Sequence, residues 1–385
     1  MTSAVAITGI GALSAAGSDL AALTGALVAG RAGLSLVKDP ALPLAALLPV
    51  GAVRTVLPER EPRTVALALH AGAAALADAG HPDPAGIGLA LGSCTGGMHA
   101  GEQVYLNHGP ERIAAAYRHQ PVGRTAVRVA QRLRLRGPVT AHAEACASAA
   151  NALAEALLWI RSGLTPMVLV IGADALTRIT MAGFHSLKVV DSAGCRPFTQ
   201  ERAGMSLGEG ACAVLLEDPA HARRRNARIH ATVLGCGLAA DAHHATAPDP
   251  SGRWMERAIR DALAEAQVAP AAIGFVAAHG TGTRDNDAHE ATTLNRLFGQ
   301  VPTASHKRSL GHTLGAAAAF GVAAAVISVR DGVLLPNCGQ PDDTSLPDLD
   351  LGQRVRRQAP GLALVTCVAF GGVNAACVIG GAERC

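Results

Sequence analysis

The residues LADAGHPDPAGIGLALGSCTG at 76–96 and LAEAQVAPAAIGFVAAHGTG at 263–282 decide the fold, because they repeat one pattern. With one gap, both copies match as the end of a helix, a Pro-containing loop, an Ile-Gly strand and a Thr-Gly loop. A second pair follows in the same order: NALAEALLWIRSG at 151–163 and FGVAAAVISVRDG at 320–332. Each member of this pair is an apolar helix that ends in Arg, a polar residue and a capping Gly. Two matches in the same order indicate an internal duplication.

The duplication predicts two similar halves, residues 1–217 and 218–385. Their boundary is expected in EDPAHARRRNAR, residues 217–228, the most polar stretch between two strand-like runs. Along the chain, short apolar runs alternate with Ala-rich helices, a pattern typical of sheets covered by helices on both faces. The runs expected to form buried strands are 5–10, 88–91, 167–171, 211–216, 229–234, 275–278 and 362–368.

The composition narrows the class of protein. The 385 residues are 49% hydrophobic and 16% charged, which excludes an intrinsically disordered chain and a coiled coil. The net charge is only +3, so no nucleic-acid partner is expected, because nucleic-acid binders usually carry a strong basic excess. Aromatic residues make up 3% while glycines number 43, so the core must consist of small side chains that let backbones approach closely.

The sequence favours a cytoplasmic protein without a membrane span. The segment MTSAVAITGIGALS lacks the basic region and cleavage site of a signal peptide. The longest apolar run, 314–329, has only about the length of a short membrane span, and we expect a helix buried inside the protein. The nine cysteines are odd in number and show neither a C-x-x-C pair nor a zinc-like spacing to histidines, which favours reduced thiols and no metal. They are Cys94, Cys146, Cys195, Cys212, Cys236, Cys338, Cys367, Cys377 and Cys385.

Cys146 is the first candidate for chemistry. It lies in EACASAA, residues 144–150, just before the apolar helix expected at 151–160. A thiol at a helix N-terminus faces the positive end of the helix dipole, which lowers its pKa and favours the thiolate. Small residues on both sides let a substrate approach the sulfur. The alternative is a buried cysteine with only a structural role.

Two histidines and a lysine lie in two further motifs. His279 begins the motif HGTGTRDND directly after an expected strand, so its ring is held at an open edge of the sheet. Lys307 and His312 lie in SHKRSLGHTLGAA, residues 305–317, at the mouth of the most apolar helix, where polar groups need partners. The alternatives are a histidine that only caps a turn for His279 and a solvated surface lysine for Lys307.

The last motif is CVAFGGVNA at 367–375, which follows a strand and opens a glycine turn. Glycines permit positive φ and expose backbone N–H groups, which suits a site that binds an oxyanion. A plain hairpin turn explains two adjacent glycines equally well.

Taken together, the four motifs resemble the β-ketoacyl-acyl-carrier-protein synthases of the thiolase-like superfamily, of the elongating type with a Cys-His-His site. The resemblance extends over nearly the whole chain, with ITGIG at 7–11, RPF at 196–198 and GEG at 208–210. It implies an α/β protein with the thiolase-like, duplicated five-layer αβαβα fold, normally a homodimer or a heterodimer with a ketosynthase-like subunit. This implication agrees with the internal repeat.

The resemblance also implies the chemistry. Cys146 is then the nucleophile that accepts an acyl chain as a thioester from an acyl carrier protein. His279 and His312 bind the thioester carbonyl of a malonyl extender on the carrier protein and assist its decarboxylation. The resulting carbanion attacks the acyl group, as in fatty-acid or polyketide-type elongation. Neither a cofactor nor a metal is implied.

Other residues receive supporting roles by the same resemblance. The backbone N–H groups of Cys146 and Phe370 form the oxyanion hole, and Phe370 gates the acyl pocket. Lys307 orders the histidines electrostatically and is paired with Glu290. The supporting residues of the glycine turn are Gly371, Gly372 and Asn374.

Three residues depart from the family pattern. Glu144 stands where the family usually has Thr or Ser, and its carboxylate either opposes thiolate formation or faces away across a dimer contact. Cys367 stands in place of Ser, and Ala369 replaces the first glycine of the Gly-Phe-Gly-Gly turn. These departures favour a specialised member that makes a polyketide, an aryl polyene or an unusual acyl chain.

Arginines are the candidates for binding the carrier protein. Acyl carrier proteins are acidic, so arginines near the pocket mouth can steer docking. The candidates are Arg63, Arg124 and Arg128, although arginines on amphipathic helices usually form only a solvated face.

Two other functions compete with a condensing enzyme. A chain-length-factor-like subunit has the same fold but is a non-catalytic partner that shapes the acyl pocket. Cys146 argues against it, because such partners generally lack the nucleophile. A thiolase acting on coenzyme A uses a second catalytic Cys in a different glycine motif near its C-terminus, and Cys377 lies outside any such motif.

Overall fold

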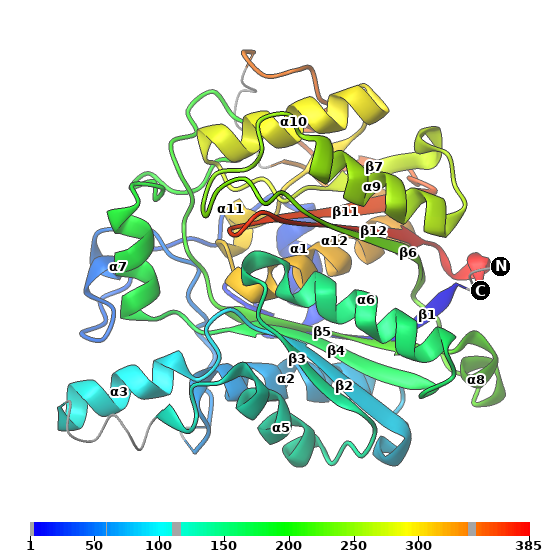
Figure 1. Cartoon of the computed structure of the whole chain (residues 1–385), viewed down its shortest axis with the longest axis horizontal. Coiled ribbons are helices and arrows are strands. Elements are labelled where there is room, and N and C mark those ends of the chain that lie inside the picture. The colour runs from blue at the N-terminus through cyan, green and yellow to red at the C-terminus, as the bar shows by residue number, and fades with distance from the viewer. Residues whose placement is uncertain (1–3, 59, 110–116, 338–343) are drawn as a thin grey trace.

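Ten strands of the described chain form one sheet in the order β3-β2-β4-β5-β1-β6-β12-β11-β7-β8 (Figure 1). The computed structural model describes residues 4–58, 60–109, 117–337 and 344–385, so Cys338 lies outside the described residues. The strands are β1 (Val5–Ser14), β2 (Ile87–Gly92), β3 (Val139–His142), β4 (Met167–Asp174), β5 (Gly210–Glu217), β6 (Ala231–Ala240), β7 (Ile273–Ala277), β8 (Thr303–Ala304), β11 (Leu362–Ala369) and β12 (Val373–Gly380). A separate small sheet pairs β9 (Val333–Leu334) with β10 (Arg356–Arg357).

The large sheet consists of two five-stranded sheets with the same pattern. In the first, β2 lies parallel between β3 and β4, and β5 lies antiparallel between β4 and β1. In the second, β7 lies parallel between β8 and β11, and β12 lies antiparallel between β11 and β6. A short antiparallel seam between residues 5–7 of β1 and 231–233 of β6 joins the two. The strand order therefore repeats, as a duplicated fold requires.

Helices cover both sheets and fill the space between them (Figure 1). α2 (Arg63–Asp78) lies on the outer face of the first sheet, and α9 (Arg253–Ala266) lies on the outer face of the second. Between the sheets, α6 (Ser148–Arg161) contacts β4 and β12, and α12 (Ala317–Asp331) contacts β5 and β11. These five layers confirm the predicted thiolase-like αβαβα fold.

The apolar run predicted to be a buried helix is α12 together with the short 3₁₀ turn before it, η6 (Leu314–Ala316). The stretch Leu314–Asp331 is long and apolar enough to cross a membrane, but 83% of it is buried inside the protein. It is therefore the core helix of the middle layer. The hydrophobic cluster around it takes side chains from both halves, for example Leu153 and Val326. Because the halves share this core, the division between residues 217 and 218 stays a prediction.

Glycines let the outer helices rest directly on the strands. A Cβ at Gly11 of β1 would lie 2.1 Å from the carbonyl oxygen of Ala71 on α2. A Cβ at Gly237 of β6 would lie 2.0 Å from the carbonyl oxygen of Ala258 on α9. The ITGIG motif near the N-terminus therefore serves packing, since any side chain at these positions would push the helix off the sheet.

The polar stretch expected at the boundary is an ordered corner. β5 ends at Glu217 and α8 (Pro219–Arg224) follows. The fully buried Glu217 carboxylate accepts hydrogen bonds from Thr8 Oγ1 and Arg225 Nε, each at 2.7 Å. Burial alone raises the pKa of Glu217, but the hydrogen bonds from Arg225, His221 and Thr8 outweigh it and lower the pKa. The ionised carboxylate thus ties β1 and β5 to the corner.

Among the strands of the large sheet, the prediction from sequence misses β3, β8 and β12. β3 and β8 have only 4 and 2 residues, too few for a periodic signal, and β12 begins directly behind the glycine turn. Among the other helices, α5 packs beside α2 and α10 packs beside α9. These other helices are α1 (Leu20–Val28), α3 (Met98–His108), α5 (Val122–Leu133), α7 (Arg178–Ser186), α10 (Arg284–Phe298) and α11 (Lys307–Leu310).

Both central helices begin after a strained turn. Ala145 has a φ of 49° directly before Cys146, and Leu314 has a φ of 52° directly before Gly315. Residues with a Cβ rarely adopt this left-handed region. Ala145 begins the short 3₁₀ helix η4 (Ala145–Ala147), which leads into α6, and Leu314 begins η6, which leads into α12. The two 3₁₀ helices contact each other. Strain of this kind concentrates at functional sites, where the surrounding structure holds it in place.

Candidate active site

The two strained turns and the loop after β7 bring three side chains to one pocket. The pocket has a volume of about 260 Å³, and its lining includes Cys146, His279, His312 and Phe370. The Cys146 Sγ and one ring nitrogen of each histidine all lie within 4.8 Å of one another, and the three side chains are buried. Three residues that the sequence predicts as catalytic thus meet, although they come from both halves of the chain.

Burial determines the protonation state of Cys146. It raises the pKa of the thiol to about 12, and the neighbouring Cys367 thiol acts in the same direction. The Lys307 ammonium and a hydrogen bond from the backbone N–H of Phe370 act in the opposite direction. The net direction is therefore opposite to the lowered pKa predicted from the helix N-terminus, because burial is the largest influence on this thiol. The resting residue is a thiol.

Both histidines are fixed as neutral hydrogen-bond donors. Nδ1 of His312 accepts a hydrogen bond from the backbone N–H of Leu314 at 3.1 Å, and Nδ1 of His279 lies 3.4 Å from the Lys307 Nζ. A ring nitrogen that accepts a hydrogen bond carries no proton, so the proton of each neutral ring is on Nε2. Burial lowers the pKa of both rings well below the ordinary value, and Lys307 lowers it further. The rings meet edge to face with centroids 5.3 Å apart.

Lys307 and Glu290 both act on His279, but through different atoms. The buried Lys307 ammonium donates to the His279 carbonyl oxygen. The Glu290 carboxylate instead accepts hydrogen bonds from the backbone N–H groups of His279 at 2.8 Å and of Gly280 at 2.7 Å. It also accepts one from the Thr366 hydroxyl at 2.6 Å. No direct ion pair joins Lys307 and Glu290 in the described part of the chain, because the backbone of the loop occupies the carboxylate, so the predicted pairing is limited to an electrostatic attraction. Glu290 still raises the pKa of Lys307 against the effect of burial.

The distances among Cys146, His279 and His312 would also allow a metal ion. A metal needs a free lone pair on each ring, and the rings present Nε2–H to the pocket. Moving the proton to Nδ1 would point it at the Leu314 N–H and at the Lys307 ammonium, which are donors themselves. The arrangement therefore suits an anionic oxygen, which can accept hydrogen bonds from both N–H groups, better than it suits a cation.

Phe370 closes one side of the pocket. Its ring stacks on Phe184 of α7, with centroids 5.6 Å apart and an interplanar angle of 12°. Phe184 also lines the pocket, and it was not predicted from the sequence. No short motif marks it, because the contact joins residues that are 186 positions apart in the chain.

The glycine turn after Phe370 is held by a second loop. Gly371 and Gly372 have φ values of 85° and 77°, which favour glycine. The Gly371 N–H donates to the Ala245 carbonyl oxygen at 2.8 Å, and the Asn374 amide donates to Asp241 Oδ1 at 2.6 Å. Asn374 is fully buried and does not reach the pocket, so its contribution is to anchor the turn.

Two threonines of the HGTGTRDND motif also line the pocket. The Thr281 and Thr283 hydroxyls lie 2.8 Å apart, and both residues contribute to the lining. From the sequence, only the histidine of this motif was predicted to have a role. The alternation of Gly and Thr after a strand was the signal that could have identified the threonines.

A buried carboxylate that was also not predicted from the sequence anchors the start of α12. The Asp174 carboxylate, at the end of β4, accepts hydrogen bonds from the hydroxyl and the backbone N–H of Thr95. It also accepts a hydrogen bond from the backbone N–H of Gly315 at 2.7 Å. Asp174 is fully buried, and burial raises its pKa against these hydrogen bonds. It ties the loop after β2 to the start of α12, next to His312.

Comparisons with known proteins agree with this geometry. Residues 59–222 match the β-ketoacyl synthase N-terminal domain family, and residues 230–340 match the β-ketoacyl synthase C-terminal domain family. The chain belongs to the β-ketoacyl synthase family. As a member, it is an acyltransferase of the condensing-enzyme type, and its Cys-His-His site lies where the two halves of the fold meet.

Individual relatives cover nearly the whole chain. Nodulation protein E of Rhizobium meliloti (strain 1021) is 33% identical over 96% of this chain and 97% of that protein. The 3-oxoacyl-[acyl-carrier-protein] synthase 2 of Vibrio cholerae is 30% identical over 95% of this chain and 96% of that protein. The solved structure of the ishigamide ketosynthase/chain length factor matches with a TM-score of 0.91 and 30% identity, covering 99% of this chain and 100% of that chain.

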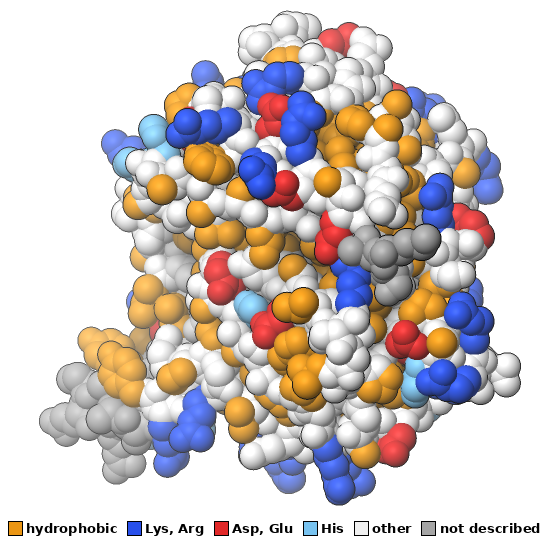
Figure 2. Space-filling model, turned by 45° about the vertical axis from the view of Figure 1, so that its right-hand side comes forward, with side chains coloured by type: hydrophobic (Ala, Val, Ile, Leu, Met, Phe, Trp, Pro, Cys, Tyr) orange, Lys and Arg blue, Asp and Glu red, His pale blue; other side chains and the backbone are white. Residues whose placement is uncertain are grey.

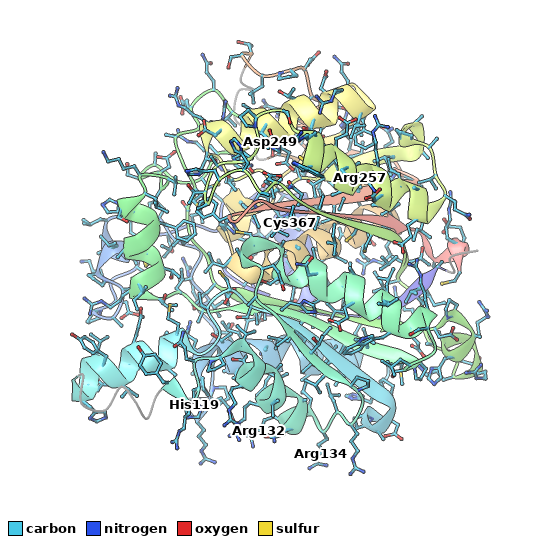
Figure 3. The ribbon with its side chains drawn as sticks, in the orientation of Figure 1. His119, Arg132, Arg134, Asp249, Arg257 and Cys367 are labelled. Atoms are coloured by element: carbon cyan, nitrogen blue, oxygen red, sulfur yellow. The ribbon has the colours of Figure 1, made fainter. Side chains whose placement is uncertain are left out.

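The three departures from the β-ketoacyl synthase pattern have different surroundings. Cys367 lies at the centre of the molecule, and its thiol donates to the Cys146 carbonyl oxygen at 3.1 Å (Figure 3). Glu144 Oε2 lies 3.6 Å from His142 Nδ1, at the open edge of β3. Ala369 lines the pocket, and nothing in the structure explains why it replaces glycine.

The arginines predicted to bind a carrier protein separate into two groups. Arg63 is only partly exposed, and its Nε donates to the buried Glu209 carboxylate at 2.7 Å, so its guanidinium already has a partner within the chain. Arg128 pairs with Glu61 at 2.9 Å but stays exposed. Arg124 is exposed and has no ion-pair partner among the described residues. Arg124 and Arg128 line a groove of about 480 Å³ whose lining also includes Arg60, Arg118 and His119.

Proposed function

We propose that this chain is the catalytic ketosynthase of a fatty-acid or polyketide-type elongation system, acting on acyl and malonyl groups held by an acyl carrier protein. The observation that carries the proposal is the meeting of one thiol with two fixed Nε2–H donors in a single buried pocket. A nucleophile alone would support simple acyl transfer. The two neutral donors add the means to stabilise an enolate, which a condensation requires.

The first step is acyl transfer to Cys146. The sulfur attacks the thioester carbonyl of the acyl group carried by the acyl carrier protein. The backbone N–H groups of Cys146 and Phe370 donate hydrogen bonds to the oxyanion that forms. The carrier thiolate leaves and takes up the proton lost by Cys146. The hydrogen bond from the Phe370 N–H to the Cys146 sulfur supports this role, because it brings that donor next to the reacting atom.

The second step is decarboxylative condensation. The malonyl thioester loses carbon dioxide and becomes an enolate. The enolate oxygen accepts hydrogen bonds from the Nε2–H groups of His279 and His312. The carbanion then attacks the acyl carbon on Cys146, the C–S bond breaks, and the sulfur leaves as a thiolate that takes up a proton from water. The product is a β-ketoacyl chain on the carrier protein. Lys307 and Glu290 are positioning residues in this proposal, because they fix the His279 backbone and the proton position of its ring.

The competing function is a chain-length-factor-like subunit, which shapes the pocket without catalysis. The ishigamide structure joins a ketosynthase with such a factor, so a likeness in fold alone does not distinguish the two roles. The intact Cys146, His279 and His312 favour the catalytic role, because a non-catalytic subunit has no use for two donors fixed around a thiol.

Cys146 and His312 allow the two steps to be tested separately. We expect intact-mass analysis to detect an acyl adduct after the protein is mixed with acyl carrier protein, and to detect none in Cys146→Ala. His312→Ala should still be acylated, but its decarboxylation of malonyl carrier protein should fall about 100-fold, because one oxyanion donor is worth about 3 kcal/mol.

Exposed His108 provides the matched control, since His108→Ala removes an imidazole outside the pocket and should leave both steps unchanged. A protein that forms no adduct, alone or with a partner subunit, would not be the catalytic ketosynthase. Normal condensation by His312→Ala would contradict the role of that ring.

We also propose that the groove lined by Arg60, Arg118, Arg124 and Arg128 binds the acidic carrier protein. His119, which also lines this groove, lies near the bottom of the molecule, across from Arg257 on α9 (Figure 3). Arg124→Glu should lower kcat/KM for carrier-bound substrate about tenfold at low salt. Added salt screens the charges, so the difference in kcat/KM between the variant and the unmodified protein should become smaller. A small pantetheine thioester should react at the unchanged rate.

Arg257→Glu is the control for charge reversal, because Arg257 is exposed and pairs with Asp261 on its own helix. Equal kcat/KM values for Arg124→Glu and the control with the carrier-bound substrate would rule out this groove as the docking surface.

We further propose a second subunit of the same fold at the edge of β3, either a copy of this chain or a ketosynthase-like partner. An exposed edge strand offers unpaired backbone groups to another strand. Large apolar side chains surround this edge, including Val139 at 40% and Leu158 of α6 at 65% exposure. Figure 2 shows hydrophobic side chains interspersed with charged ones over the middle of this side of the molecule. A single-chain mass in light scattering, with and without candidate partners, would contradict this proposal.

A cytoplasmic location belongs to the same proposal. The eight described cysteines are all free thiols, and reduced thiols are typical of the cytoplasm.

A further inference from the structure

Two thiols outside the pocket face each other across a pair of strands. Cys236 on β6 and Cys377 on β12 are directly opposite in the antiparallel register, and their Sγ atoms lie 3.1 Å apart. Neither residue lines the active-site pocket. The mechanism proposed above uses neither of them.

The backbone geometry suits a disulfide at this position. The Cys236 N–H donates to Glu265 Oε2 at 2.5 Å and not to the opposite strand, so the cysteines form a non-hydrogen-bonded pair. The Cα atoms of such a pair lie about 4.5 Å apart. Disulfides span Cα distances of about 4.4–6.8 Å, so the two cysteines can be joined without moving either strand.

The two thiols differ in their access to solvent. β6 pairs with β1 only through residues 231–233, so Cys236 lies beyond the seam on an open edge and is partly exposed. Cys377 is buried on the central face of β12. An oxidant from solvent therefore reaches Cys236 first, and Cys377 is placed to react with the product.

We propose that Cys236 and Cys377 form a modification site, which closes to a reversible disulfide when the protein meets a hydroperoxide. The Cys236 thiolate attacks the peroxide and becomes a sulfenic acid while the O–O bond breaks. The Cys377 sulfur then attacks the Cys236 sulfur, forms the S–S bond and releases water. In total, two thiols and one hydrogen peroxide give one disulfide and two waters. In a reducing cytoplasm such a bond is transient, as expected of a redox sensor.

The cross-link would act on both rims of the pocket. β6 leads into Asp241 and the loop 241–248, and β12 begins directly after the glycine turn 371–372. The two rims already touch, because the Asp241 N–H donates to the Gly372 carbonyl oxygen at 2.7 Å. Residues 246–248 and Phe370 line the pocket. A covalent bond between β6 and β12 would therefore hold these rims in one relative position. This inference does not depend on which reaction the pocket performs.

Peroxide treatment of the full chain tests the site. After hydrogen peroxide and blocking of the remaining thiols, we expect a Cys236–Cys377 peptide in a non-reducing digest, with a mass about 2 Da lower from the loss of two hydrogens. Dithiothreitol should reverse it, and Cys236→Ser should abolish it. Cys236 is partly exposed, so this variant is expected to fold. Cys212→Ser, a buried thiol on another strand, should retain the cross-link.

Two results would overturn the proposal. Peroxide that adds only oxygen to Cys146 or Cys236, without a cross-linked peptide, would exclude the disulfide. Hydrogen exchange then tests the coupling: we expect amides in 241–248 and 370–373 to exchange about threefold more slowly in the cross-linked protein, and at an unchanged rate in peroxide-treated Cys236→Ser. A cross-linked protein with unchanged exchange in these segments would exclude an effect on the pocket rims.

Discussion

The whole arrangement depends on the absence of a side chain at Gly172 in the centre of the first sheet. A Cβ there would lie 2.8 Å from the Ala316 Cα and 2.9 Å from the Ala149 Cβ, at the starts of the two central helices. Because both helices approach this one point, their N-terminal turns meet, and Cys146 and His312 face the same pocket. The chemistry of the site therefore rests on packing of backbone against backbone, which the Ala- and Gly-rich composition makes possible.

The two halves use the same strained turn for different purposes. In the first half, the left-handed Ala145 precedes the nucleophile. In the second, the left-handed Leu314 precedes Gly315, whose N–H is bound by the buried Asp174, and the Leu314 N–H fixes the ring of His312. The duplicated fold is thus asymmetric at the point where its halves touch: one turn carries the Cys146 thiol, and the other fixes the ring of His312. The anchor, Asp174, comes from the half that carries Cys146.

The sequence was sufficient for the layers and for the centre of the site. The repeated segments predicted the duplication, and Cys146, His279 and His312 stood in motifs whose local chemistry could be recognised. What the sequence could not reveal depends on distance in the chain. Phe184 meets Phe370 only in the folded protein, Arg63 finds Glu209 in the same way, and the Glu290 carboxylate binds a backbone loop. The raised pKa of Cys146 was missed for the same reason, because the sequence shows the helix dipole but does not show complete burial.

The low pKa values of His279 and His312 make the hydrogen-bond donors of the pocket insensitive to moderate acidification. Because both pKa values lie well below 6.5, acidification through the range in which an ordinary histidine becomes charged leaves these rings neutral. Their N–H groups are set by Leu314 and Lys307, so the rings also cannot exchange donor and acceptor ends easily. In a cell whose internal pH drifts, the pocket would offer the same pair of donors throughout, much as a pair of amide groups would.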